Sequence, residues 1–112
     1  MARFEDLDVV FGGAHHDFVS IFTICKDFGF KDQITRSGLS IPSNIAEGFE
    51  RGSDKDSTKF FYYAKGSSGE LRTQIYIGIE IGYISKETGM SWKNEAELIS
   101  KMLSALIKSR TA

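Results

Sequence analysis

The segment Ile41-Pro42-Ser43-Asn44-Ile45-Ala46-Glu47-Gly48 decides the fold, because it sets a proline inside a helical pattern. Apolar and small residues recur there at three- and four-residue steps, which places them on one face of a helix. These are Ile34, Gly38, Ile41, Ile45 and Phe49. Proline lacks the amide that would bond four residues back. We therefore predict a helix over residues 31–51 that is kinked near Pro42 or broken there into two shorter helices.

Three more segments carry helical spacing. The first runs to Phe28, with Gly29 as its stop, and has the stripe Phe11, Ala14, Phe18, Ile21, Phe22, Cys25 and Phe28. A third helix should begin after Ser53, an N-cap with an acid three residues on, and continue to about Gly82. Its stripe is Phe60, Phe61, Ala64, Ser67, Ser68, Leu71, Ile75, Gly78 and Gly82.

The last helix should be capped by Ser85 or Ser91. Its expected buried face is Trp92, Ala96, Ile99, Met102, Leu103, Leu106 and Ile107. The stretch 75–81 alternates weakly, as a strand would, but no hairpin partner with matching alternation exists. Four helices with short joints predict an all-α, antiparallel up-and-down four-helix bundle.

Composition bounds the class of protein. At 112 residues, the chain is expected to form one domain over residues 1–112. The single cysteine excludes an internal disulfide, and the first residues lack the pattern of a secretory leader, so we expect a cytoplasmic protein. No apolar run is long enough to span a membrane. The formal net charge of −1 weighs against a dedicated nucleic-acid binder but leaves room for a local basic patch.

The third helix carries more apolar character than one buried stripe requires. Segments 60–63 and 75–81 spread aromatic and aliphatic side chains around much of its circumference. A helix of this kind must be covered on more than one side, which predicts packing against another copy of the chain. In the alternative interpretation, the tyrosines lie flat on the surface.

No candidate for catalysis, a cofactor or a metal survives inspection. His15-His16-Asp17 is the only cluster resembling metal ligands, but adjacent helical residues point about 100° apart. Cys25 lies on an apolar stripe, where burial suppresses thiolate chemistry. Segment 66–69 lacks the lysine and the preceding strand of a phosphate loop. We expect a protein without enzymatic activity, cofactor or metal.

Polar residues of the second and third helices suggest an interhelical network. We expect Asn44, Glu47, Ser67 and Glu70 to hydrogen-bond across the two helices, with Arg36 or Arg72 as counter-charge. The alternative, an acid and base pair of Glu47 and Glu70, has no second catalytic group beside it. The structural motif as a whole comprises Pro42, Ser43, Asn44, Glu47, Gly48, Ser67 and Glu70.

Basic residues supply candidate nucleic-acid contacts. They lie near the joint of the second and third helices and towards the C-terminus. The candidates are Arg36, Arg51, Lys55, Lys59, Lys65, Lys101, Lys108 and Arg110. A merely solvated face is the competing interpretation, although an oligomer would gather weak patches into one surface.

Segment 36–48 resembles the four-helix bundle family first noticed in intervening sequences of 23S ribosomal RNA genes. Further similar stretches are 4–7, 60–64, 66–67, 70–71, 82–85, 101–103 and 106–108. The resemblance implies an up-and-down bundle assembled as a homopentamer, without enzymatic activity. It also implies a relation to the accessory protein of diversity-generating retroelements, which binds a reverse transcriptase and nucleic acid. The chain departs from the family pattern at segment 10–13, and at Gly38 and Gly69, where alanine is more usual.

Two functional hypotheses follow. The first is a homo-oligomeric binding module for structured RNA or for an RNA-processing or reverse-transcribing partner. The second is a purely structural or protein-interaction oligomer without affinity for nucleic acid. Salt-dependent binding of structured RNA would separate them.

Overall fold

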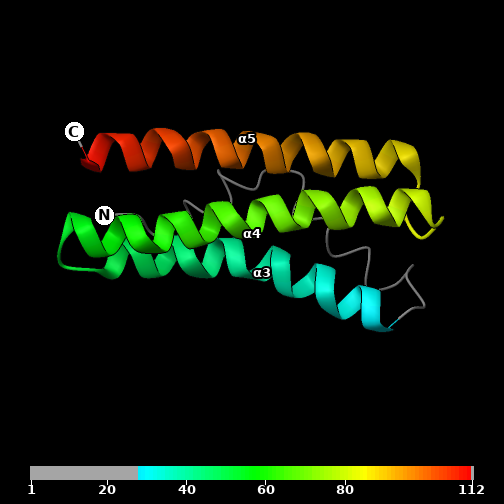
Figure 1. The fold of residues 1–112 in the computed structure, drawn as a ribbon, viewed down its shortest axis with the longest axis horizontal. Helices are drawn as coiled ribbons and strands as arrows, with labels where there is room; N and C mark the ends of the chain where they lie inside the picture. The colour runs from blue at the N-terminus through cyan, green and yellow to red at the C-terminus, as the bar shows by residue number, and fades with distance from the viewer. Residues whose placement is uncertain (1–27, 112) are drawn as a thin grey trace.

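The computed structural model describes residues 28–111, which form three consecutive α-helices. They are α3 (Phe28–Glu50), α4 (Asp54–Glu80) and α5 (Lys86–Thr111). Successive helices run in opposite directions, and α4 lies between α3 and α5 (Figure 1). The described residues contain no strand, so the all-α prediction is confirmed, including a helical segment at 75–80. The first of the four predicted helices lies outside the described residues, except for Phe28.

Helix α3 passes through Pro42 without interruption, so the alternative of two shorter helices is wrong. A proline removes one backbone hydrogen bond, and the packing of the residues around it holds the rest of the helix together. Ile41 and Ile45 on either side are 0% and 5% exposed. Figure 1 shows the N-terminal part of α3 sloping away from α4, while its C-terminal part runs beside that helix.

The start of α3 also differs from the prediction. Gly29 was expected to end the preceding helix, but it lies in the first turn of α3. Phe30 explains the earlier start. Its ring packs at 73° against Tyr83, with 5.4 Å between the ring centroids. This tertiary contact offsets the helix-weakening effect of one glycine, about 1 kcal/mol.

Local capping sets the limits of α4 and the start of α5. The Ser53 hydroxyl accepts a hydrogen bond from the Asp56 amide at 3.2 Å, as predicted. At the other end, Gly82 takes φ +80°, and the Tyr83 amide donates to the Gly78 carbonyl at 2.8 Å. Ser85 caps α5, because its hydroxyl accepts from the Thr88 amide at 3.2 Å.

One apolar core joins the three helices. Its described members are Ile34, Ile41, Ile45, Phe61, Ala64, Leu71, Ile75, Ile84, Trp92, Ala96, Ile99, Leu103 and Ile107. The predicted face of α5 is therefore confirmed in the main. Met102 is the exception, since it is 43% exposed. Its neighbour Leu103 occupies the buried stripe, and an adjacent helical residue points about 100° away.

Glycines bring the helices close together in the core. A Cβ built on Gly48 of α3 would lie 2.7 Å from Cδ1 of Phe61 in α4. One on Gly78 would lie 2.7 Å from Cζ of Phe30, and one on Gly89 of α5 would lie 2.6 Å from Cγ1 of Ile79. At these distances the neighbouring side chain would have to shift, and the fully buried Phe61 ring opposite Gly48 has the least room to do so.

Candidate nucleic-acid interface

Adjacent serines fix α4 against both of its neighbours. Ser67 Oγ lies 2.7 Å from Ser40 Oγ of α3. Ser68 is fully buried, and its hydroxyl donates to the Ala96 carbonyl of α5 at 2.8 Å. The two contacts show that the serines in segment 66–69 serve helix packing.

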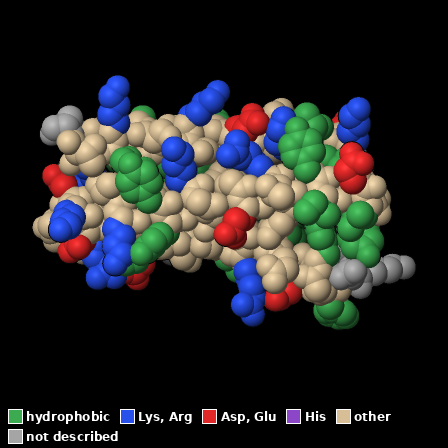
Figure 2. Space-filling view, viewed as in Figure 1, with side chains coloured by type: hydrophobic (Ala, Val, Ile, Leu, Met, Phe, Trp, Pro, Cys, Tyr) green, Lys and Arg blue, Asp and Glu red, His purple; other side chains and the backbone are tan. Residues whose placement is uncertain are grey.

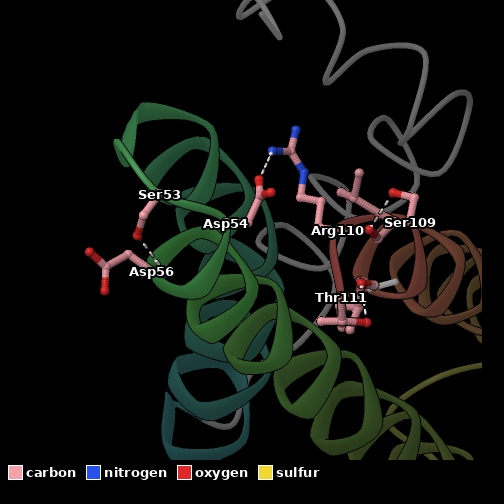
Figure 3. A network of polar contacts seen from close by, with 8 residues as sticks. Ser53, Asp54, Asp56, Ser109, Arg110 and Thr111 are labelled. Carbon is pink, nitrogen blue, oxygen red and sulfur yellow. Dashed lines mark hydrogen bonds and ion pairs between the residues drawn. The ribbon is translucent and has the colours of Figure 1, made fainter.

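An ion pair at the end of the bundle fixes the same α4–α5 register. Arg110 Nη1 lies 3.3 Å from Asp54 Oδ1, so the end of α5 lies beside the start of α4. Figure 3 shows Arg110 reaching across to Asp54, next to the Ser53 cap. The Arg110 guanidinium also lies 5.5 Å and 5.6 Å from the ring centroids of Phe49 and Phe61. Arg110 therefore contributes to packing at this end of the bundle.

The structure arranges the predicted interhelical motif differently. Ser67 does bond across to α3, but its partner is Ser40, which in turn accepts from Asn44 Nδ2 at 3.0 Å. Glu47 is exposed and pairs with Arg51 at 2.9 Å within the same segment of chain. Glu70 is exposed and has no hydrogen bond or ion pair with another described residue. The two glutamates thus do not join the helices, because both lie outside the α3–α4 contact.

The other members of the motif act through backbone and packing. Gly48 lies against Phe61, as described above, and Pro42 is half-buried within α3. Ser43 is exposed. Of the expected counter-charges, Arg36 pairs instead with Asp32 of its own helix, with 3.1 Å between Nε and Oδ2.

Five of the eight candidate basic residues share one outward surface. On α4, Lys55 and Lys59 are one turn apart and exposed, and Lys65 lies towards α5 at its border. On α5, Lys101 and Lys108 are two turns apart and exposed. The antiparallel register places Lys108 level with Lys55, and Lys101 nearly level with Lys65.

We call this set the lysine face: Lys55, Lys59, Lys65, Lys101 and Lys108. Figure 2 shows Lys and Arg side chains spread over the left half of α4 and α5, with an apolar side chain among them. Acidic side chains in that half lie towards its edge in this view. Five lysines therefore share one surface although the overall formal charge is −1.

The candidate lysines and arginines differ in whether they form ion pairs with carboxylates. The candidate arginines, Arg36, Arg51 and Arg110, each form an ion pair with a carboxylate. Within residues 28–111, none of the five lysines forms an ion pair. The Lys59 ammonium lies 6.0 Å from the Tyr63 ring centroid. Because no described carboxylate holds the five ammonium groups, they can exchange counterions for phosphates, so the lysine face is the better nucleic-acid candidate.

Lys93 extends the same side of the bundle and was missed from the sequence. Its ammonium lies 5.2 Å from the Tyr76 ring centroid and 3.5 Å from Glu97 Oε1. A hydrogen bond with Tyr76, aided by attraction to Glu97, raises the pKa of Lys93 above its ordinary value. The Tyr76 contact depends on the α4–α5 register, which no spacing within one helix indicates.

Other kinds of site find little support in the described residues. No group of three His, Cys, Asp or Glu side chains within residues 28–111 is placed to hold a metal ion. The His15-His16-Asp17 cluster and Cys25 lie outside that range. Among the described helices, none is long and apolar enough to cross a membrane.

The described residues define a class of protein: an all-helical bundle with one packed apolar core. The chain matches the model of the 23S rRNA-intervening sequence protein family over residues 14–105, and it belongs to that family. A search of curated proteins finds no match.

A similar solved structure comes from Bacteroides thetaiotaomicron, a protein of unknown function from the S23 ribosomal protein family. The two chains are 28% identical, and the match covers 88% of this chain and 98% of the other. The TM-score is 0.78. The likeness therefore extends over nearly the whole of both proteins.

Proposed function

We propose that this protein is a non-enzymatic, self-associating helical bundle whose lysine face binds structured RNA or a partner that processes or reverse-transcribes RNA. The observation that carries the proposal is the set of five lysines without carboxylate partners on one surface of α4 and α5. Membership of a family described by its link to 23S rRNA supports the same choice.

The proposal includes the architecture that the resemblance implies. The apolar stripe from Phe11 to Phe28 supplies the fourth helix, and the complete bundle assembles as a homopentamer in the cytoplasm. The family match begins at residue 14, so it includes most of that stripe. A ring of copies would repeat the lysine face around its axis and strengthen the attraction for RNA phosphates.

RNA binding is tested by fluorescence anisotropy with a labelled RNA hairpin over a range of salt concentrations. The double variant Lys59→Gln/Lys65→Gln should bind about tenfold more weakly at low salt and show a shallower salt dependence, because two phosphate contacts are lost. Its matched control is Lys31→Gln/Lys86→Gln, which removes the same charge outside the lysine face. Equal losses in both variants, or no binding by the wild type even at low ionic strength, would overturn the RNA proposal.

A second candidate is the protein-interaction oligomer, and exposed apolar side chains on α4 favour it. Tyr63, Ile77 and Ile81 are 49%, 49% and 51% exposed. The predicted apolar excess is thus present on the described surface, and a second copy would bury it. Sedimentation equilibrium tests the point: a pure monomer at micromolar concentration would remove self-association from both candidates.

A further inference from the structure

One side chain on the lysine face is aromatic and has no partner among residues 28–111. Tyr62 is 56% exposed, and no hydrogen bond or ring contact joins it to another described residue. It lies one turn after Lys59 in the outward stripe of α4 and one turn before Gly66. Lys65 follows it by three residues on the side towards α5. Lysines of the face therefore precede and follow Tyr62 along the helix, and the Lys59 ammonium itself lies 6.0 Å from the ring centroid of the adjacent Tyr63.

Gly66 lies one turn after Tyr62 and carries no side chain that could pack against it. Residues four apart on a helix are neighbours, so a large side chain at position 66 would contact the one at position 62. A Cβ built on Gly66 would meet nothing within 4 Å. Packing within residues 28–111 therefore gives no reason for a glycine in the middle of α4.

From this arrangement we infer that Tyr62 is a stacking platform for an unpaired nucleotide of RNA, a proposal that rests on the proposed function. The base stacks on the exposed ring, and Lys59 and Lys65, three residues to either side of Tyr62, are placed to neutralise the neighbouring phosphates. Stacking of this kind tolerates any base, because every base has a π-face. Paired bases inside an A-form duplex cannot reach the ring, so unpaired segments are preferred.

Charge favours RNA over a second copy of this chain as the occupant. A copy seated on Tyr62 would need carboxylates opposite the five unpaired lysines, whereas an RNA strand offers a phosphate at every nucleotide. Of the side chains that suit a second copy, Ile77 and Ile81 lie towards the other end of α4, and Tyr63 is next to Tyr62.

The test compares two labelled RNA probes by fluorescence anisotropy. One is a single strand of about 12 nucleotides, a length that single-strand-binding domains commonly contact, and the other is a duplex of the same sequence. Tyr62→Leu should weaken single-strand binding about tenfold and leave duplex binding unchanged, because only the single strand stacks. Tyr62→Phe keeps the ring and should bind as the wild type does.

Gly66 provides an independent variant. Gly66→Leu should cover the ring and weaken single-strand binding by a similar factor, while Gly66→Ala, its matched control, should leave binding near the wild-type value. Both substitutions introduce better helix formers, so thermal unfolding should show a raised Tm for each. A loss of binding in Gly66→Leu could then not be ascribed to unfolding.

The outcomes are distinct. If the wild type binds neither probe, the proposed function fails. If the wild type binds both probes while Tyr62→Leu keeps its affinity for both or loses affinity for both equally, the stacking proposal is overturned. That result leaves the proposed RNA binding by the lysine face in place. If Tyr62→Leu lowers the mass found by sedimentation, Tyr62 belongs to a contact between copies, and the stacking proposal is again overturned.

Discussion

The inner and outer faces of α4 use glycine in opposite ways. On the inner side, Gly48 of α3 and Gly78 of α4 lie where an added Cβ would come within 2.7 Å of an aromatic carbon. On the outer side, a Cβ at Gly66 would meet nothing within 4 Å, and one at Gly69 would meet only Arg72 Nη2 at 3.8 Å. The same residue type therefore marks close helix contact on one face and open surface on the other.

This difference teaches how to interpret small residues in a helical stripe. A glycine that removes a clash is fixed by the protein's own core, and its substitution should cost stability. A glycine that touches nothing weakens its helix by about 1 kcal/mol, and no packing contact in the core offsets that cost. The packing of residues 28–111 does not explain such a glycine.

The largest effect should come from Gly48→Ala on the inner side. The new Cβ would press on the ring of Phe61, which is fully buried and packs at 61° against Phe49. We expect a loss of about 2 kcal/mol in the free energy of unfolding, measured by urea denaturation. Combining it with Phe61→Leu should cost less than the sum of the two single losses. If Gly48→Ala were as stable as the wild type, the claim that inner-face glycines are needed for close helix packing would be wrong.

A smaller loss should follow removal of the buried hydroxyl that joins α4 to α5. Ser68→Ala deletes the hydrogen bond to the Ala96 carbonyl, and we expect a loss of about 1 kcal/mol in thermal or urea unfolding. Ser67→Ala is the matched control one residue away. Its bond to Ser40 is only partly buried, so water can replace it and the loss should be smaller. The reverse order of the two losses would contradict this account.

The smallest effect, and the only gain, should come from Gly66→Ala on the outer side. Alanine fits the open surface and favours the helix, so the free energy of unfolding should rise by roughly 0.5–1 kcal/mol. Gly69→Ala, with an ordinary contact at 3.8 Å, should behave alike. A destabilised Gly66→Ala would show that this surface is already covered in the protein as purified.

Much of the described fold could be predicted from short-range patterns. Ser53 and Ser85 cap their helices through contacts that span only three residues, and the buried stripe of α5 follows helical spacing. Such signals lie within one segment of sequence. The start of α3 could not be predicted in this way, because Phe30 packs against Tyr83, more than fifty residues away.

The candidate site was predictable as a set of residue types but not as an arrangement. The sequence supplied eight basic candidates without showing which of them carry a partner. The pairing of Arg110 with Asp54 depends on how α5 lies beside α4, and so does the grouping of Lys101 with Lys65. The interhelical hydrogen bond was assigned to the wrong partners for a similar reason, since the small Ser40 lies in the contact and the longer Glu47 and Glu70 lie outside it.

The order of the helices has a consequence for how the protein forms during synthesis. Helix α4 packs against its neighbours in the chain on both sides, so most contacts join segments that are close in sequence. Such contacts close short loops and form quickly. The pairing of α3 with α4 can therefore precede the emergence of α5 from the ribosome. The lysine face cannot form before α5 has emerged, because its residues belong to both α4 and α5. A truncated chain would lack the complete surface, so the RNA binding that we propose for it would require the finished protein.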